Sequence, residues 1–253
     1  MTKQRSRRPA SALRDADGRV WTYGRHAVAA ALANPARTFS EALFSKNAEA
    51  DFEAALTSAA GAVRPDSASP AEISARLPAG AVHQGAALFG PPPPSLSLDV
   101  LCAAPALNKP IVVLDQVTDP QNIGAIFRSA AAFGAAGLVL HDRRTPPLGG
   151  ALAKAAAGAV DLLPHSRVPN IAQALALLGD AGYVRIGLTG DGETLSVERA
   201  EAPIALVLGA EGAGLRRLTR DRCDRLARIP IAPEMESLNV SAAAAVALFA
   251  ITR

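Results

Sequence analysis

From Ile111 onward, short apolar runs alternate with segments of helical periodicity, and this alternation restricts the fold more than any other feature of the chain. Strands that are apolar throughout and separated by helices are typical of a parallel sheet covered on both faces. We therefore predict an α/β domain over residues 111–253. The predicted strands are Ile111–Asp115, Gly137–His141, Val184–Thr189, Ile204–Leu208 and Leu226–Ile229. The predicted helices are Ile123–Phe133, Gly150–Ala157, Ile171–Ala181, Leu215–Arg222 and Val240–Thr252.

A run of four prolines, Pro91–Pro94, separates this domain from an earlier and smaller part of the chain. Such a run cannot continue a helix or donate hydrogen bonds to a sheet, and it favours a stiff, extended conformation. We predict an interdomain linker over residues 91–110 and a small mixed α/β domain over 19–90. Residues 1–18 are polar and basic, which is typical of a disordered tail.

The composition is that of a soluble globular protein, because 49% of the 253 residues are hydrophobic and 19% are charged. The longest apolar run, Ala242–Ile251, is too short to span a membrane. The two cysteines and four histidines show no metal-ligand spacing, so we expect no metal site and no disulfide. These features predict a protein of the reducing cytoplasm with no membrane partner.

A glycine-rich turn, Gly209–Gly214, follows the predicted strand Ile204–Leu208 and precedes a helix. Its three glycines let the backbone approach a ligand closely and adopt positive φ angles. The turn lacks the G-x-G-x-x-G order of a dinucleotide site. Glu211 within it has the alternative role of complementing the positive end of the next helix. We interpret the turn as a ligand loop.

Six arginines follow this turn within thirteen positions, and they give the chain a local basic cluster. The guanidinium group binds phosphate oxygens in pairs, so the cluster favours contact with RNA. The alternative is a solvated helix face that is balanced by Asp221 and Asp224. The arginines are Arg216, Arg217, Arg220, Arg222, Arg225 and Arg228.

Two further segments place polar residues at predicted helix starts. Asn122 stands at the cap position after the strand Ile111–Asp115, and Arg128 lies on the helix that follows. Alone, this pattern indicates an ordinary capped helix, but loops at the carboxyl ends of parallel strands are where such sheets build sites. Ser237 and Asn239 precede the final helix, and either of them is a suitable cap.

In this order, three segments resemble the motifs of the SPOUT superfamily, in particular its SpoU-type RNA 2′-O-ribose methyltransferases. The segments are Pro120–Arg128, Leu208–Leu215, and Ile229–Ile231 together with Ser237–Ala242. The likeness covers residues 111–253 and is strongest to the bacterial 23S ribosomal RNA guanosine-2′-O-methyltransferases.

Two segments of the first domain carry a separate likeness. Tyr23–Val28 and Ala81–Gly85 resemble signatures of the substrate-binding domain of those enzymes, which is similar to the ribosomal L30e fold and helps to bind RNA. The resemblance therefore implies a knotted (trefoil) parallel-sheet SPOUT domain preceded by a smaller L30e-like α/β domain. General topology rules argue against a knot. The resemblance also implies a homodimer with the site at its interface, which suits the apolar final helix.

The resemblance implies S-adenosylmethionine as the cofactor and RNA as the substrate. Arg128 then stabilises the developing alkoxide of a ribose 2′-hydroxyl, because arginine holds its proton tightly and is a poor base. An RNA phosphate is the expected proton acceptor. Asn122, Glu211, Ser237 and Asn239 are expected to orient Arg128 and the ribose. The implied cofactor contacts are Thr189, Gly190, Leu208, Gly209, Ile229 and Leu238. The implied RNA contacts are Arg25, His26, Arg216, Arg217 and Arg220.

Three other functions are compatible with these patterns. A tRNA ribose is an alternative substrate, and a non-catalytic RNA-binding knot protein is an alternative of a different class. The retention of Asn122, Arg128 and the glycine turn argues against the second. An α/β enzyme acting on small molecules is the third, but the chain lacks a nucleophile elbow and a dinucleotide fingerprint.

Overall fold

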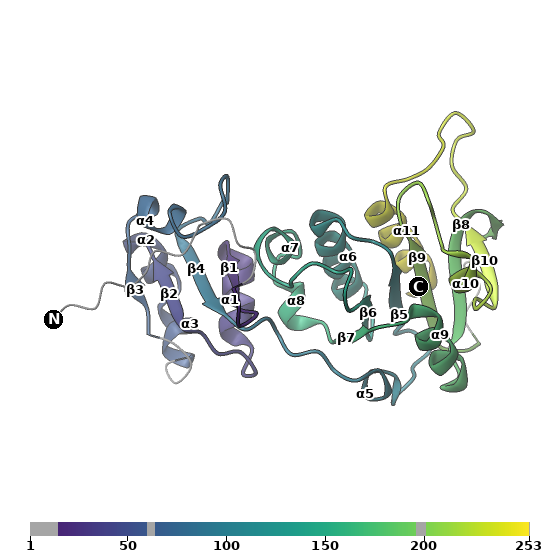
Figure 1. Ribbon diagram of the computed structural model, residues 1–253, viewed down its shortest axis with the longest axis horizontal. Coiled ribbons are helices and arrows are strands. Elements are labelled where there is room, and N and C mark those ends of the chain that lie inside the picture. The colour runs from purple at the N-terminus through teal and green to yellow at the C-terminus, as the bar shows by residue number, and fades with distance from the viewer. Residues whose placement is uncertain (1–14, 60–63, 196–200, 253) are drawn as a thin grey trace. The chain divides into compact units, whose positions relative to one another are not determined.

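The computed structural model describes residues 15–59, 64–195 and 201–252. The chain divides into two compact units (Figure 1). The first ends at Pro93 and also includes Pro147–Lys154, and the second comprises Pro94–Pro146 and the residues from Ala155 onward. Most of the predicted basic tail, residues 1–14, lies outside the described residues.

The first unit contains a four-stranded sheet in the order β1-β4-β2-β3. Strand β4 is buried along its whole length because helices pack on both of its faces. Its alternate side chains point to opposite sides: Leu88 packs with Val28 and Phe44, and Ala87 packs with Tyr23 and Ile73. The elements are β1 (Val20–Tyr23), α1 (Arg25–Ala33), β2 (Glu41–Phe44), α2 (Lys46–Asp51), α3 (Glu53–Ser58), β3 (Asp66–Ser67), α4 (Pro70–Ser74) and β4 (Ala86–Gly90).

The second unit contains a six-stranded sheet in the order β10-β8-β9-β5-β6-β7, and every neighbouring pair is parallel. This confirms the predicted α/β class with a parallel sheet. The strands are β5 (Ile111–Asp115), β6 (Gly137–His141), β7 (His165–Val168), β8 (Val184–Thr194), β9 (Ile204–Gly209) and β10 (Arg225–Arg228). The helices are α5 (Leu98–Cys102), α6 (Pro120–Ala132), α7 (Gly150–Ala155, mostly in the first unit), α8 (Ala159–Leu162), α9 (Ile171–Asp180), α10 (Arg217–Arg220) and α11 (Val240–Thr252).

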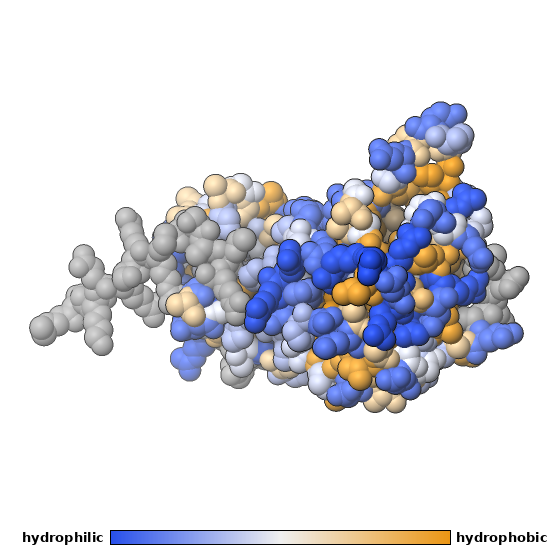
Figure 2. Space-filling model, turned by 45° about the vertical axis from the view of Figure 1, so that its right-hand side comes forward, coloured by the Kyte–Doolittle hydropathy of each residue, from blue (hydrophilic) through white to orange (hydrophobic). Residues whose placement is uncertain are grey.

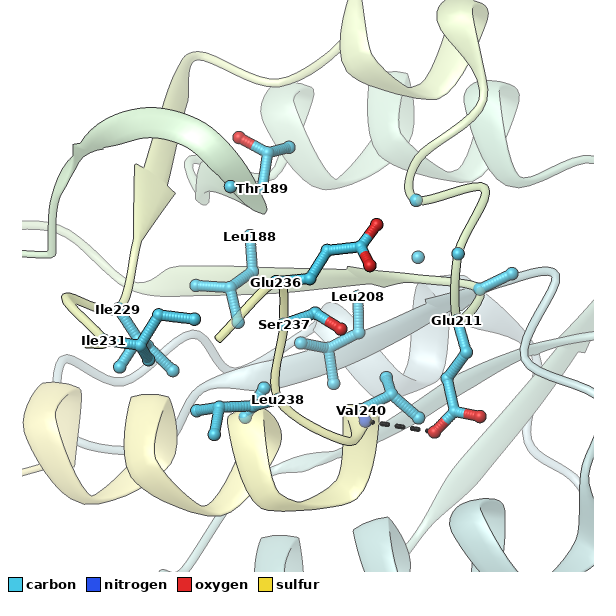
Figure 3. A pocket seen from close by; sticks show the side chains of 16 residues that line it. Leu188, Thr189, Leu208, Glu211, Ile229, Ile231, Glu236, Ser237, Leu238 and Val240 are labelled. Carbon is cyan, nitrogen blue, oxygen red and sulfur yellow. Dashed lines mark hydrogen bonds between the residues drawn. The ribbon is translucent and has the colours of Figure 1, made fainter. Parts of the chain in front are cut away.

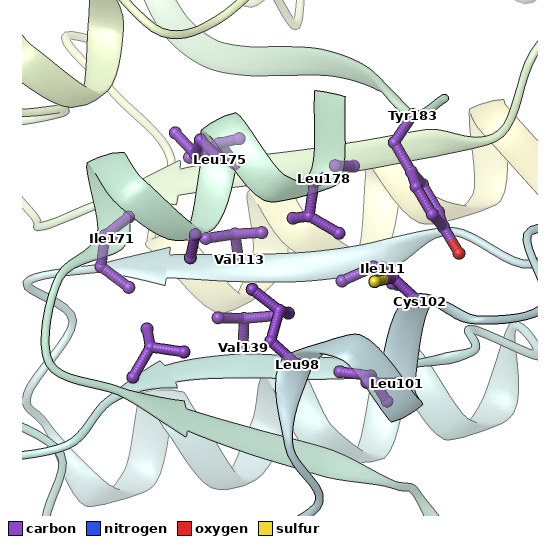
Figure 4. Close-up of a cluster of buried hydrophobic side chains, with 14 residues drawn as sticks. Leu98, Leu101, Cys102, Ile111, Val113, Val139, Ile171, Leu175, Leu178 and Tyr183 are labelled. Atoms are coloured by element: carbon purple, nitrogen blue, oxygen red, sulfur yellow. The ribbon is translucent and has the colours of Figure 1, made fainter. Parts of the chain in front are cut away.

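The core of the second unit forms between the sheet and the helices on its two faces. On one face, Val113 and Val139 pack against Ile171 and Leu175 of α9, and α5 closes the end of this cluster (Figure 4). On the other face, α6 and α11 pack against each other and against the sheet. Phe127 of α6 is fully buried there. No helix among the described residues is long and apolar enough to cross a membrane.

The described part of the second unit contains three elements that the sequence patterns did not predict: α5, α8 and β7. Helix α5 lies within residues 91–110, where Ser97 caps it and Leu98 and Leu101 enter the core of the second unit. Strand β7, with the sequence His-Ser-Arg-Val, lies at the edge of the sheet and carries a single aliphatic residue. A short, polar edge strand has no apolar run by which a pattern could identify it.

Strand β7 contributes a buried imidazole that makes the stability of the second unit depend on pH. His165 is 2% exposed, its Nε2 has no hydrogen-bond partner among the described residues, and its ring lies 6.0 Å from that of Phe127. Burial, reinforced by the charge of Arg167, lowers the pKa of His165 from 6.5 to about 4. In the unfolded chain, His165 therefore takes up a proton near pH 6.5. In the folded chain it does so only near pH 4.

We expect stability to fall as the pH drops from 6.5 to about 4. The loss due to His165 is about 3 kcal/mol, since each unit of pKa difference contributes roughly 1.4 kcal/mol. Urea unfolding of the parent and of His165→Gln, at several pH values between 7 and 4.5, measures this loss. The parent should lose more stability than the variant, whereas parallel losses would contradict a neutral, buried His165.

Candidate active site

A cavity of about 300 Å³ lies at the carboxyl end of β9, between residues 188–190 of β8 and the segment that joins β10 to α11. Three segments that are separate in the sequence therefore line one cavity. All six residues expected to contact a cofactor line this cavity: Thr189, Gly190, Leu208, Gly209, Ile229 and Leu238. The other lining residues are Leu188, Ala210, Glu211, Gly212, Gly214, Ile231, Glu236, Ser237, Val240 and Ala243.

Much of the cavity wall is apolar (Figure 3). Leu188 and Leu208 are contributed by the two strands, and Leu238 and Val240 belong to the start of the final helix and the residues before it. The rest of the wall includes the main chain of the glycine turn and two carboxylate side chains. The lining residues include no lysine, arginine or histidine, so the cavity is a poor site for a phosphate group.

The glycine turn is closed by its own main chain. Ala210 N donates to Gly214 O at 3.1 Å, and Gly214 N donates to Ala210 O at 2.9 Å. Gly212 and Gly214 have φ angles of 76° and 65°, which glycine adopts without strain. Gly209 packs so closely that a Cβ on it would lie 2.3 Å from the carbonyl carbon of Gly214. The turn therefore requires glycine at Gly209 for space and at the other two positions for conformation.

We expect Gly209→Ala to lower the thermal unfolding midpoint, because the new methyl group overlaps main-chain atoms that cannot move aside. Such overpacking typically costs about 1–3 kcal/mol. Gly190→Ala is the matched control, since a Cβ there meets nothing within 4 Å. Scanning calorimetry should show a clear decrease for the first variant and little change for the second. Equal midpoints would mean that the turn is looser than the structure shows.

Glu211 joins the glycine turn to the starts of two helices through one carboxylate oxygen. Its Oε1 accepts hydrogen bonds from Asn122 Nδ2 at 3.1 Å, from Asn239 Nδ2 at 2.7 Å and from Val240 N at 3.4 Å. Asn239 Nδ2 also donates to Asn122 Oδ1 at 2.9 Å. Glu211 therefore ties the start of α6 and the start of α11 to the glycine turn, and this arrangement orients both amides.

The cap of α6 differs from the expectation. Asp119, not Asn122, is the N-cap, and its carboxylate accepts a hydrogen bond from Asn122 N at 2.8 Å. Asp119 precedes Pro120, which occupies the first turn, so the helix begins earlier than predicted. The side chain of Asn122 is thereby left to bond Glu211. At α11, Asn239 takes the capping role: its Oδ1 accepts from Ser241 N at 2.9 Å.

The remaining two residues expected to be catalytic are placed differently. Ser237 lines the cavity. Arg128 is exposed on α6 and does not line it. Among the described residues, Arg128 forms no hydrogen bond and no ion pair, so its guanidinium is available to a ligand or to another chain.

Two of the three arginines expected to contact RNA after the glycine turn are hydrogen-bonded to carboxylates. Arg216 Nε donates to Asp115 Oδ1 at 2.7 Å, and Arg216 N donates to Asp115 Oδ2 at 3.1 Å. Arg220 makes two hydrogen bonds to Asp191, at 3.0 and 2.7 Å, and these hold the pKa of Asp191 at about 2. The side chain of Arg217 is 89% exposed, and its Nε lies 3.9 Å from Asp221. Arg217 therefore presents the most accessible guanidinium of the three.

The two signature segments of the first unit lie side by side. Gly24 N donates to Ala86 O at 3.3 Å, and Arg25 N donates to the side chain of Gln84 at 3.2 Å. Arg25 and His26, both expected to contact RNA, are exposed at the start of α1. The guanidinium of Arg25 forms an ion pair with Asp51 at 2.8 Å.

Both parts of the chain match known families. Residues 109–249 match the SpoU rRNA Methylase family, and residues 21–95 match the family described as RNA 2′-O ribose methyltransferase substrate binding. The solved structure of the SpoU methyltransferase AviRb from Streptomyces viridochromogenes, in complex with AdoMet, has a TM-score of 0.76 to this chain. It is 22% identical, and the match covers 93% of this chain and 90% of AviRb, so it shows a shared fold.

Two curated relatives are more similar in sequence. An uncharacterized tRNA/rRNA methyltransferase of Mycolicibacterium vanbaalenii is 41% identical over 183 residues, which is 70% of this chain. A 23S rRNA (guanosine-2′-O-)-methyltransferase, RlmB, of Burkholderia sp. is 45% identical over 144 residues, which is 56% of this chain. In each case the match spans 58% of the relative's own length.

Proposed function

This chain belongs to the SpoU rRNA Methylase family, and from that membership we propose that it methylates the 2′-hydroxyl of a ribose in RNA, with S-adenosylmethionine as the methyl donor. The observation that carries the proposal is one cavity of about 300 Å³ lined by three separate segments of the chain, beside which Glu211 bonds Asn122 and Asn239. That volume is within the range of small-molecule sites.

The residues of the cavity fit this cofactor. Its apolar wall suits the adenine ring, and the main-chain groups of the glycine turn are accessible to ribose and amino-acid groups. The two carboxylates and the lack of a basic lining residue favour a cationic ligand over a dinucleotide. S-adenosylmethionine, when bound, supplies a methyl group on a positively charged sulfonium. We propose that Thr189, Gly190, Leu208, Gly209, Ile229 and Leu238 hold it.

The protein then has to position and activate the ribose hydroxyl. The ribose oxygen would accept the methyl group that the bound cofactor supplies, and the proton of the hydroxyl would pass to an RNA phosphate. Arg128 stabilises the charge that develops on the oxygen. Asn122, Glu211 and Asn239 form one hydrogen-bonded group that fixes the geometry beside the cavity, and Ser237 lies on the wall next to it.

We also propose that the protein acts as a homodimer. The exposed side of α11 is apolar, with Val246 46% and Phe249 52% exposed. The segment between β10 and α11 projects from the surface, and its residues 231–239 are all exposed (Figure 1 and Figure 2). A second copy that covers these features would bring its own residues to the site, which accounts for an Arg128 that does not line the cavity of a single chain. Light scattering of the purified protein tests this state.

Membership of the SpoU rRNA Methylase family also suggests the detailed fold of each unit. We propose that the second unit contains a trefoil knot and that the first unit is an L30e-like RNA-binding domain. The strand order supports the knot, because β10 lies at the sheet edge while α11 returns to pack against α6 and β9. The main-chain path in an electron-density map tests it. For the first unit, the accessible Arg25 and His26 and the match to a substrate-binding family support the assignment.

The proposed substrate is a guanosine of 23S ribosomal RNA in the cytoplasm. The relative from Burkholderia, which carries that name, supports ribosomal RNA. The relative from Mycolicibacterium is named for both tRNA and rRNA, so a tRNA ribose remains the second candidate. Mass mapping of 2′-O-methyl groups in total RNA, from cells with and without this protein, separates the two. The missing modification identifies the substrate.

Calorimetric titration with S-adenosylmethionine, followed by transfer of a tritiated methyl group to RNA, tests the reaction itself. We expect binding at one site per chain and label in the 2′-O-methyl nucleosides of digested RNA. Binding of RNA without binding of the cofactor would instead indicate a non-catalytic RNA-binding protein. Label in a base rather than in a ribose would also contradict the proposal.

A further inference from the structure

The two carboxylates that line the cavity are in different states. Glu211 accepts three hydrogen bonds through its Oε1, from two side-chain amides and one main-chain N–H. Glu236 lies on the segment between β10 and α11, and its carboxylate extends over the cavity (Figure 3). Among the residues that the structure describes, Glu236 forms no hydrogen bond and no ion pair. Of the two carboxylates, Glu236 is therefore the one whose negative charge has no hydrogen-bond donor or cation beside it in the described chain.

The methyl donor and its product differ by one charge. S-adenosylmethionine carries a positive sulfonium, whereas S-adenosylhomocysteine carries a neutral thioether, and the rest of the two molecules is alike. A sulfonium has no N–H or O–H group, so the protein recognises it by charge and not by a donated hydrogen bond. A carboxylate on a cavity wall without a basic side chain is a group that can make this distinction.

We propose that Glu236 gives the cavity its preference for the sulfonium form of the cofactor over the thioether product. The inference depends on the proposed function, because it assumes that the cavity binds S-adenosylmethionine. No covalent step is involved. The attraction is present before the methyl group leaves and absent afterwards, so it favours both binding of the methyl donor and release of the product.

The variant Glu236→Gln tests the charge alone, because glutamine keeps the shape of the side chain and an acceptor oxygen. Calorimetric titration of parent and variant with each ligand measures the preference. We expect the affinity for S-adenosylmethionine to fall about fivefold, as for a partly exposed ion pair, with little change for S-adenosylhomocysteine. The parent's preference should also decrease with added salt, which screens an exposed charge.

Glu234→Gln is the matched control, since Glu234 is an exposed glutamate of the same segment that does not line the cavity. It should leave both affinities as they are. Glu236→Asp retains the charge and should retain most of the preference. Both replaced side chains are exposed, so circular dichroism should show the parent's fold in every variant.

Three results would overturn the inference while leaving the proposed function in place. They are an equal loss of both affinities in Glu236→Gln, no loss of either, and a loss of the same size in Glu234→Gln. An equal loss would place the carboxylate on a group that donor and product share, such as the ammonium. A parent protein that fails to bind S-adenosylmethionine would instead contradict the proposed function itself.

Discussion

Replacement of Arg128 by alanine is expected to reduce methyl transfer by roughly 10²–10³-fold, the usual effect of removing a group that stabilises a developing oxyanion. The affinity for S-adenosylmethionine should stay unchanged, because Arg128 is exposed on α6 and does not line the cavity. The guanidinium is proposed to act through its charge and its N–H donors and not as a base.

Single-turnover transfer of a tritiated methyl group, together with calorimetric titration of the cofactor, separates these two effects. Arg144→Ala is the control for the loss of a surface charge, since Arg144 is an exposed arginine of the second unit that does not line the cavity. Arg128→Lys keeps the positive charge but loses the planar guanidinium group with its paired N–H donors, so we expect a rate of methyl transfer between those of the parent and Arg128→Ala. Equal turnover by Arg128→Ala and the parent would refute the assignment. A parallel loss of cofactor binding would place Arg128 in the cofactor site.

Asp115→Ala is expected to destabilise the second unit by about 3 kcal/mol, the lower end for removing one partner of a buried ion pair. The carboxylate of Asp115 is fully buried, and Arg216 Nη2 lies 2.6 Å from it. The pair links the end of β5 to the segment that follows β9, because Asp115 ends β5 beside Gly209, the last residue of β9. Arg216 follows the glycine turn, so the pair also holds that turn against the sheet. The Arg216 side chain is 45% exposed and can be rehydrated when its partner is lost, which limits the penalty.

Thermal unfolding measures this effect, with an expected decrease of roughly 6–12 °C at 2–4 °C per kcal/mol. Asp191→Ala is the matched control, because Asp191 and Arg220 form an exposed ion pair in the same unit, with Asp191 65% exposed. An exposed pair is worth at most about 1 kcal/mol. A double-mutant cycle of Asp115 and Arg216 should then show coupling between the two. Equal decreases in the unfolding temperature for Asp115→Ala and Asp191→Ala would contradict the claim that the buried ion pair stabilises the protein more than the exposed one.

Several elements were predictable because they depend on near neighbours. The bounds of β5, β6 and α11 agree with the sequence pattern, since continuous apolar runs and an apolar helix leave few alternatives. The residues expected at the cofactor came from motifs in a known order, and all of them line the cavity. Strand β8 continues to Thr194, beyond the predicted end at Thr189, because β10 pairs with its polar extension.

Other features depend on residues that are distant in the sequence. No local pattern indicates that Asp115 is the partner of Arg216, or that Glu211 contacts Asn122 and Asn239. The arginine cluster looked uniform in the sequence, yet Arg216 and Arg220 are engaged by carboxylates while Arg217 is accessible. The place of Glu236 on the cavity wall likewise has no signal in the neighbouring sequence.

The amino-acid sequence by itself determined the α/β class, most of the strands and helices of the second unit, and the family. These follow from apolar periodicity, turn residues and short motifs, which act over a few neighbouring positions. Only the tertiary structure decided which polar groups meet, because the order of the sheet places β9 beside β5 and the final helix beside the glycine turn. Hydrogen bonds and ion pairs act over a few ångströms, so their partners are set by that order and not by distance along the chain.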